Sequence, residues 1–339
     1  MNILITSVGR RTYLVEYFKQ ALGDKGKVFV SNSCAVYAFE LADGSFISPY
    51  IYEENYIPAL LEYCKAHKIT AVLSVFDIDL MVLARHKDLF LQHGITLLVS
   101  DTDCITICND KFKTYTALSE FNILHPKTYL DVESALLALN KQEISFPLII
   151  KPRYGMGSLG IFEANTLDEM NFFYQYVQKI IQQTYVKYGT IFENSSKVII
   201  QEKIIGKEYG LDILNSLTSE FVTVVAKEKL AMRAGESDSV RLCDNAPFFA
   251  LAKKISTSIR HIANLDVDCM VTNDNKIYVI EMNARFGGQY PFSHLAGVNF
   301  PLQLIKWLRG EATDRELLSY KNGMLCTKNI VPVELKQQP

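Results

Sequence analysis

The sequence predicts an α/β unit followed by an α+β region, and three observations lead to this fold class. Short apolar runs alternate with amphipathic stretches over about the first 110 residues, which is typical of βαβ units and a parallel sheet. After Phe146 the predicted strands outnumber the helices, and the last two strands are joined by the short turn Asn273–Asn275. The chain has 339 residues, of which 49% are hydrophobic, and this length predicts two or three domains.

The first part of the chain supplies the elements of the parallel sheet. Ile3–Val8 is a short, continuous apolar run, as expected of a strand that is buried on both faces. Thr12–Leu22 places Leu14, Phe18 and Ala21 on one face of a helix. The other elements predicted here are strands at Lys27–Ser31, Ala71–Phe76 and Thr96–Val99, and helices at Pro58–Lys65, Ile78–Gln92 and Asp103–Phe121, the last capped by Ser100 or Asp101.

The pattern changes near Pro126, after which strands become more frequent. Asp131 is expected to begin a helix at Val132–Asn140, and Thr166 with Glu169 forms a capping box before a long amphipathic helix. A further helix is predicted at Phe248–Ala263. The strands predicted in this part are Phe146–Lys151, Ile161–Ala164, Lys197–Lys203, Tyr209–Asn215, Phe221–Lys227, Val267–Thr272 and Lys276–Met282.

The composition indicates which partners the protein can bind and where in the cell we expect it. The 35 Lys and Arg against 37 Asp and Glu give a net charge of -2, which argues against a strongly basic nucleic-acid-binding protein. No apolar run reaches the roughly 18 residues of a membrane span, so no membrane contact is expected. The seven cysteines are odd in number and widely spaced, and Ile3–Val8 is too short for a signal peptide. We therefore expect a cytoplasmic protein with reduced cysteines.

A glycine-rich segment follows the predicted strand that ends at Lys151. Backbone N–H groups near Gly155, Gly157, Ser158 and Gly160 can converge on phosphate oxygens, and the lysine adds positive charge. The segment is no Walker A loop, because a strand and not a helix follows it. A hairpin turn with incidental glycines is the alternative.

A second group of polar residues lies on the last two predicted strands. Glu281 and Asn283 are two residues apart and face the same side, with Arg285 in phase, and Asp268 lies on the neighbouring strand. Two carboxylates and an amide oxygen are suited to Mg²⁺ or Mn²⁺ bound to nucleotide phosphates. The alternative is a solvated sheet edge. A third and weaker indication of a binding site is the apolar strand that leads into the charged segment at residues 202–208. Such a segment can bind a purine.

Taken in order, these segments resemble the ATP-grasp superfamily, in its branch similar to the large chain of carbamoyl phosphate synthase. The resemblance covers nearly the whole chain. It implies an ATP-grasp fold with an N-terminal parallel-sheet pre-grasp domain at 1–110, a small lid subdomain at 111–202 and a C-terminal subdomain at 203–330. The segments that carry it are Met1–Arg11, Cys108–Lys111, Lys151–Ile161, Arg233–Glu236, Glu281–Gly288 and Tyr290–Asn299.

The resemblance also implies a role for individual residues. Many relatives carry Gln where this chain has Asp268, so the metal can be held differently here. Arg233 can pair with a substrate carboxylate or a phosphate. The implied roles are phosphate binding by Lys111 and Lys151, a flap at Gly155–Gly160, an adenosine site at Glu202, Lys203, Ile204 and Glu208, metal binding by Asp268, Glu281 and Asn283, and a basic group near the transferred phosphate at Arg285.

The activity implied is ATP-dependent ligation of a carboxylate to an amine or a thiol through an acyl phosphate, with release of ADP and phosphate. Small carboxylates and amines are the expected partners, and the apolar helices allow a homodimer. Carbamoyl-phosphate or carboxy-phosphate formation is an alternative, although one ATP-grasp unit does not favour full carbamoyl phosphate synthesis. A non-catalytic ATP-binding regulator is a third reading. Arg10, Arg11, Asp77 and Asp79 lie at the carboxyl edge of the predicted sheet, either as substrate contacts or as solvated loop charges.

Overall fold

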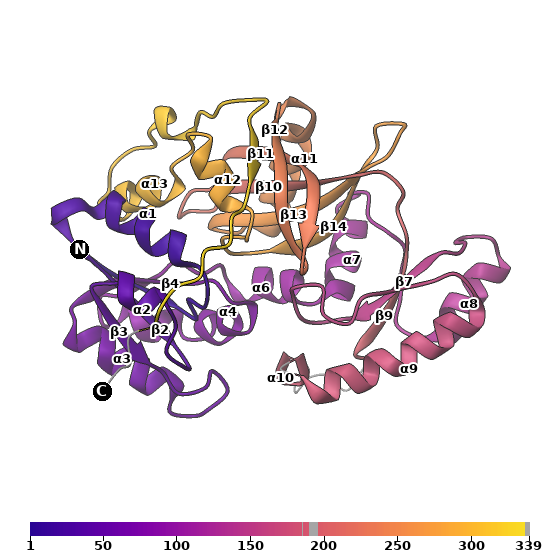
Figure 1. Cartoon of the computed structure of the whole chain (residues 1–339), viewed down its shortest axis with the longest axis horizontal. Coiled ribbons are helices and arrows are strands. Elements are labelled where there is room, and N and C mark those ends of the chain that lie inside the picture. The colour runs from indigo at the N-terminus through magenta and orange to yellow at the C-terminus, as the bar shows by residue number, and fades with distance from the viewer. Residues whose placement is uncertain (185, 190–195, 336–339) are drawn as a thin grey trace.

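Three β-sheets organise the residues that the computed structural model describes, which are 1–184, 186–189 and 196–335. A five-stranded parallel sheet comes first along the chain, a four-stranded antiparallel sheet follows, and a six-stranded antiparallel sheet completes the fold. In Figure 1 the first sheet lies at one end of the long axis and the four-stranded sheet at the other, with the six-stranded sheet between and above them. The predicted combination of an α/β unit with an α+β region is confirmed.

The parallel sheet has the strand order β3-β2-β1-β4-β5, which places β1 at its centre. Ile3, Leu4 and Ile5 are fully buried because helices cover both faces of this strand. The strands are β1 (Asn2–Thr6), β2 (Lys27–Asn32), β3 (Gly44–Ile47), β4 (Ile69–Ser74) and β5 (Thr96–Leu97). The helices are α1 (Thr12–Leu22), η1 (Gly23–Lys25), α2 (Ala38–Leu41), α3 (Tyr56–Ala66), α4 (Asp77–Ala84), α5 (Lys87–Leu91), α6 (Thr102–Asn109) and α7 (Lys111–Glu120).

Two helices predicted as continuous are each divided in the structure. The stretch 78–92 forms α4 and α5, and the stretch 103–121 forms α6 and α7. Asp110 causes the second division, because its extended backbone (φ -104°, ψ 102°) ends α6 while its carboxylate accepts hydrogen bonds from the N–H groups of Phe112 and Lys113. The expected cap Asp101 stands before α6 but makes no side-chain cap hydrogen bond. The break at Asp110 puts Lys111 at the first position of a helix.

The four-stranded sheet, with the order β6-β9-β7-β8, has its own hydrophobic core. Thr166 accepts a hydrogen bond from the N–H of Glu169, as predicted, but Glu169 accepts from the N–H of Asn165 and so completes the box one residue earlier. The elements are β6 (Thr128–Tyr129), α8 (Val132–Asn140), β7 (Leu148–Pro152), β8 (Phe162–Ala164), α9 (Leu167–Gln183), α10 (Val186–Gly189) and β9 (Val198–Glu202).

The six-stranded sheet has the order β14-β13-β10-β11-β12-β15. β11 runs six residues beyond its predicted end at Lys227, and β12 was missed because serine and charged residues interrupt its apolar pattern. β13 begins at Ala263, where a helix was predicted to end. The elements are β10 (Lys207–Asn215), β11 (Phe221–Arg233), β12 (Glu236–Cys243), α11 (Ala246–Ile259), β13 (Ala263–Val271), β14 (Ile277–Asn283), α12 (Tyr290–Leu295), α13 (Phe300–Leu308), η2 (Arg315–Leu318) and β15 (Leu325–Thr327).

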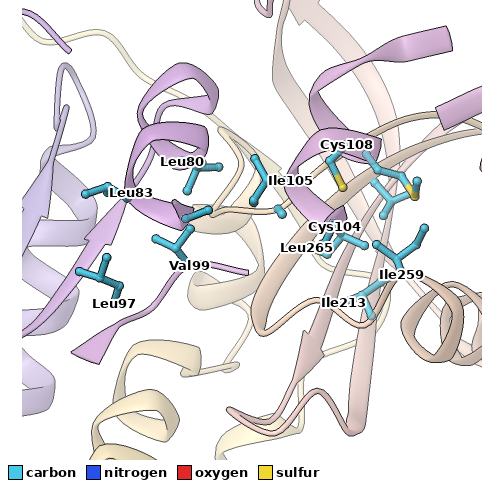
Figure 2. Packing of buried hydrophobic residues seen from close by; sticks show 14 of the residues in the cluster. Leu80, Leu83, Leu97, Val99, Cys104, Ile105, Cys108, Ile213, Ile259 and Leu265 are labelled. Carbon is cyan, nitrogen blue, oxygen red and sulfur yellow. The ribbon is translucent and has the colours of Figure 1, made fainter. Parts of the chain in front are cut away.

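Helix α6 joins the parallel sheet to the six-stranded sheet through one hydrophobic cluster (Figure 2). Leu80 and Leu83 of α4 lie on one side of Ile105, and Ile213 and Leu265 of the six-stranded sheet lie on the other. Cys104 and Cys108 belong to this cluster, and all seven cysteines are free, as expected. Within the described residues, every helix is too short or too polar to cross a membrane. The two sheets are thereby held together beneath the loops that carry the candidate site.

Candidate functional site

An open cleft of about 1080 Å³ lies between the glycine-rich segment and the six-stranded sheet. Strands β7, β10, β11, β13 and β14 and the loops that follow β7 and β14 contribute its walls. Residues that are far apart in the sequence therefore meet here. The predicted site residues that line this cleft are Lys111, Lys151, Gly155, Gly157, Ser158, Glu208, Asp268, Glu281, Asn283 and Arg285.

Two lysines lie at the floor of the cleft. Lys111, at the start of α7, donates to the carbonyl of Gly155 at 2.6 Å, and its Nζ lies 3.3 Å from Oε1 of Glu281. Lys151, at the end of β7, is buried, and burial lowers the pKa of its ammonium to about 8, although Glu281 opposes the shift. Among the described residues, none hydrogen-bonds to the Lys151 ammonium. A buried cation without such a partner is costly, which suits a site for an anion.

Oxygen donors lie beside these lysines on two paired strands. The register of β13 and β14 places Asp268 opposite Glu281 and Asp266 opposite Asn283, so that their side chains share one face. No cluster of three or more His, Cys, Asp or Glu within the described residues is arranged to hold a metal. Two carboxylates and an amide nevertheless fit Mg²⁺, because this ion takes one or two carboxylates together with substrate phosphates.

Lys229 was missed by the sequence analysis, yet it is central to this wall. It lies on β11 beyond the predicted end of that strand, and its Nζ is 2.7 Å from both Glu208 and Asp268. Burial alone would lower the pKa of Lys229, but the two carboxylates raise it above the ordinary lysine value. Asp268 is therefore paired with a lysine in this chain. The sequence hinted at this position only because Lys229 follows Lys227 by two residues and so shares its face of the strand.

Arg285 connects the cleft to the parallel sheet. Its Nε lies 3.2 Å from Asp77 at the start of α4, and its Nη1 lies 3.0 Å from Asp266 on β13. Gln289 donates to Asp266 at 2.5 Å. It reaches that position because Gly210 has no side chain, since a Cβ there would lie 1.6 Å from the Gln289 amide oxygen. Arg285 thus lies between carboxylates of α4 and β13.

The charged residues at the carboxyl edge of the parallel sheet separate into different environments. Arg11 lines the cleft, 3.7 Å from Glu236, and Asp77 contacts Arg285. Asp79 is fully buried and accepts hydrogen bonds from neighbouring hydroxyl groups, so we assign it a structural role and not a role in binding substrate. Arg10 is exposed and lines none of the clefts found among the described residues.

Five other predicted residues lie outside the lining of this cleft. Arg233 is 57% exposed and pairs with Asp238 at 3.0 Å. Lys203 pairs with Glu163 at 2.6 Å, and Glu202 accepts from the backbone N–H of Lys127. Ile204 is half-buried beside them, and Gly160 belongs to the flap without lining the cleft. Their assignments to the adenosine site, the flap and catalysis stay predictions.

The glycine-rich segment rests on the turn between β11 and β12. Gly235 lies at this turn with a φ of +77°, and a Cβ there would lie 2.6 Å from the carbonyl oxygen of Gly157 and 2.9 Å from Cβ of Ser158. Backbone contact this close is available only to glycine. The turn therefore supports the segment in the position where it covers the cleft.

The resemblance to the ATP-grasp superfamily implies that ATP binds in this cleft, and on that expectation Gly235→Ala should raise the KM for ATP several-fold because the new methyl group displaces the glycine-rich segment. Steady-state ADP release measured over a range of ATP concentrations checks this. Gly323→Ala is the matched control, because Gly323 has the same φ of +77° with nothing within 4 Å of the added Cβ. Both variants carry the same backbone strain of about 1 kcal/mol. Equal KM values in the two variants would contradict the supporting role of the turn.

Comparison with known proteins adds a family context to this geometry. The family model described as an ATP-grasp domain matches residues 108–289, and one described as the PylC-like N-terminal domain matches residues 3–98. The carbamoyl phosphate synthase large chain of Thermoanaerobacter sp. (strain X514) is 24% identical over 245 residues, which is 69% of this chain. The match spans 21% of that relative, so this chain corresponds to about a fifth of its length.

Two solved structures share the fold across almost the whole chain. Biotin carboxylase from Campylobacter jejuni, described as a complex with beta-gamma-ATP, has a TM-score of 0.74 at 16% identity and covers 94% of this chain and 73% of its own. The L-amino acid ligase from Bacillus licheniformis has a TM-score of 0.71 at 16% identity and covers 98% of this chain and 81% of its own. At these identities the likeness shows the fold alone.

Proposed function

Because the chain belongs to the ATP-grasp family, we propose that it is an ATP-dependent ligase that joins a carboxylate to an amine or a thiol through an acyl phosphate. The observation that carries this proposal is the meeting of Lys111 and Lys151 with the oxygen donors Glu281, Asp268 and Asn283 across one cleft. Cations next to oxygen donors that suit Mg²⁺ are what phosphoryl transfer from Mg-ATP requires.

Each group in the cleft has a distinct task in this reaction. Lys111 and Lys151 bind phosphate oxygens and stabilise the negative charge that develops on them. Asp268, Glu281 and Asn283 would hold Mg²⁺, and the bound ion would neutralise charge on the phosphates. Arg285, fixed between Asp77 and Asp266, presents a cation that cannot lose its proton. No side-chain nucleophile is needed, because the substrate carboxylate attacks the terminal phosphorus and ADP leaves.

The glycine-rich segment protects the activated acid from water. An acyl phosphate hydrolyses readily, so the cleft must exclude water between activation and attack by the amine or thiol. Gly235 packs closely against the backbone of Gly157 and would hold the glycine-rich segment over the cleft. Attack of the amine on the acyl carbon then releases phosphate and leaves the amide.

Carboxy-phosphate formation from bicarbonate is the second candidate, favoured by the similarity to the carbamoyl phosphate synthase large chain. It uses the same cleft and the same phosphoryl transfer, and differs only in the acid. A homodimer and a third possibility, a regulator that binds ATP without turnover, stay predictions. Measurement of ADP release with bicarbonate as the only acid separates the second candidate from the first.

The deciding experiment measures ADP and phosphate release with Mg-ATP across a matrix of carboxylic acids, amines and thiols. Hydroxylamine is included to trap activated acyl groups as hydroxamates. Carboxylate-dependent hydroxamate supports the ligase, and ADP release with bicarbonate alone supports the second candidate. Tight nucleotide binding without turnover in any arm would contradict both and favour the regulator.

Nucleotide binding should take up protons at alkaline pH because of Lys151. Burial lowers its folded pKa to about 8, so above pH 8 most of the ligand-free protein carries it neutral. Phosphate oxygens raise that pKa again, so at about pH 8.5 each bound ATP should draw in about 0.7 proton, and affinity should fall as pH rises through 8 to 9. Calorimetric titration in buffers with different ionisation enthalpies measures the uptake.

Lys151→Arg is the control, because a guanidinium keeps the charge and does not titrate in this range. Its nucleotide binding should show no linked protonation at the same pH. If the variant took up as many protons as the unchanged protein, Lys151 would not be the group that meets the phosphates.

A further inference from the structure

A second cleft, of about 1060 Å³, is lined by α4, α6, the start of α7 and the glycine-rich segment. It shares Lys111, Glu281 and Asn283 with the first cleft, so a molecule bound there would touch residues that also line the proposed site of phosphoryl transfer. The proposed reaction needs a place for the acceptor, the amine or thiol that attacks the acyl phosphate, in addition to places for ATP and the acid.

Side chains of both charges line the second cleft, and two of its carboxylates have close cations. Asp110 accepts hydrogen bonds from Nε and Nη2 of Arg153, each at 2.6 Å. Glu281 lies 3.3 Å from Nζ of Lys111. The remaining carboxylate is that of Asp77. The charged residues in this lining are Asp77, Arg85, Asp110, Lys111, Lys113 and Glu281.

The hydrogen bonds of Asp77 are incomplete. Its Oδ1 lies 3.2 Å from Nε of Arg285 without the geometry of a hydrogen bond, and its Oδ2 accepts from Nη2 of Arg285 at 3.5 Å. Within the part of the chain that the structure describes, Asp77 Oδ1 and Arg285 Nε are buried and have no hydrogen-bond partner. Asp266, by contrast, accepts from Arg285 at 3.0 Å and from Gln289 at 2.5 Å. Buried polar atoms nearly always have partners, so Asp77 can accept a further donor.

The backbone places Asp77 between the two clefts. Asp77 is the first residue of α4, and its carbonyl accepts a hydrogen bond from Nδ2 of Asn109, the last residue of α6, at 2.7 Å. The side chain lines the second cleft and is 12% exposed. Its ion-pair partner Arg285 lines the first cleft. A donor bound to Asp77 would therefore lie near the cation proposed to act on the transferred phosphate.

We propose that the second cleft binds the acceptor of the ligation, and that this acceptor is an amine whose N–H group donates a hydrogen bond to Asp77. An amine supplies strong N–H donors, whereas a thiol is a weak donor and a thiolate would be repelled by the carboxylate. Asp77 thereby orients the nitrogen toward the acyl phosphate. The inference rests on the proposed ligase function and deepens it by naming the class of acceptor, its site and a residue that orients it.

The test compares amines and thiols that share a carbon skeleton, with the acid that gives most hydroxamate. Ethanolamine is paired with 2-mercaptoethanol, alanine with 2-mercaptopropionate, and benzylamine with benzyl mercaptan, and mass spectrometry measures the amide and thioester products. The value of kcat/KM should be at least about tenfold higher for the best amine than for its thiol, because a hydrogen bond to a charged group contributes that much.

Thr106→Trp places a large side chain in the second cleft from α6, and should raise the KM for the amine at least about tenfold. Thr116→Trp is the matched control, because Thr116 on α7 is exposed and lies outside both clefts, and the KM should not change. Thermal melting of both variants checks that they fold.

Asp77→Asn separates contact with the amine from support of Arg285. It should raise the KM for the amine at least about tenfold, because an amide oxygen is a weaker acceptor than a carboxylate. Acyl phosphate formation without amine, followed by positional exchange of labelled oxygen in ATP, should change much less. Asp266→Asn is the comparison, because Asp266 pairs with the same arginine but does not line the second cleft. It should slow the exchange and leave the KM for the amine unchanged.

Saturation-transfer NMR of the same amines in the presence of Mg-ADP separates failure of this inference from failure of the ligase function. Binding of an amine that Thr106→Trp and Asp77→Asn both weaken, without turnover, would keep the amine site and remove the ligase. Amide formation with an unchanged KM for the amine in both variants, or thioesters formed as efficiently as amides, would keep the ligase and overturn the inference. The absence of binding by every amine in the panel would overturn it as well.

Discussion

Glu281→Gln is expected to lower ATP-dependent hydroxamate formation by at least about 100-fold, because the amide removes the negative charge that we propose holds Mg²⁺ against the phosphates. Glutamine keeps the size of the side chain and one carbonyl oxygen, so the packing of β14 should be preserved. Glu281 also forms an ion pair with Lys111, and its loss frees that lysine in the ground state. Initial rates with saturating Mg-ATP and acid measure the effect.

The control for this variant is Glu228→Gln. Glu228 lies on β11 and forms ion pairs with Lys207 and Arg241, and it does not line the cleft. Its replacement should leave the rate within about twofold, because ion pairs with exposed partners contribute little. Thermal melting of both variants confirms folding. Turnover by Glu281→Gln within tenfold of the unchanged protein would remove Glu281 from the metal site.

Arg285→Ala is expected to destabilise the fold by about 3 to 5 kcal/mol and to abolish turnover. The guanidinium is buried between Asp77 and Asp266, and its removal leaves two buried carboxylates without their cation. Arg285→Lys keeps the charge but cannot meet both carboxylates, so an intermediate loss is expected. Urea denaturation followed by circular dichroism measures the free energy of unfolding.

Arg241→Ala serves as the comparison for this loss of stability. Arg241 pairs with Glu228 at 3.5 Å and is 49% exposed, so its removal should cost about 1 kcal/mol or less. If both arginine variants unfolded at the same urea concentration, the ion pairs that Arg285 makes with Asp77 of α4 and Asp266 of β13 would contribute no stability. Retention of full turnover by Arg285→Ala would contradict a role for this cation in the cleft.

The fold class could be predicted because hydrophobic periodicity is local. The central strand β1 and the helix α1 have apolar patterns that a single segment displays. The division of the helix at Asp110 could not be read in this way, because the extended backbone there is stabilised by Arg153, 43 residues away. Strand β12 was missed because its neighbours β11 and β15, and not its own pattern, define it as a strand.

The candidate site, too, could be predicted only where a local sequence pattern marks its residues. Glu281, Asn283 and the glycine-rich segment could be found because each belongs to a short motif with its own spacing. Lys229 has no such motif, and its importance arises only when β11 is aligned beside β10 and β13.

The hydrophobic cluster around α6 has a consequence for how this protein can be divided. Two family models meet between residues 98 and 108, which suggests a place to cut the gene. Yet Ile105 and Cys108 pack against both sheets, so a fragment made by such a cut would present an apolar face to solvent and aggregate. The four-stranded sheet, with a separate core of its own, is the segment that recombination could exchange between homologues. The parts of this chain that can be exchanged are therefore set by its hydrophobic cores, and not by the residues at which the two family models begin and end.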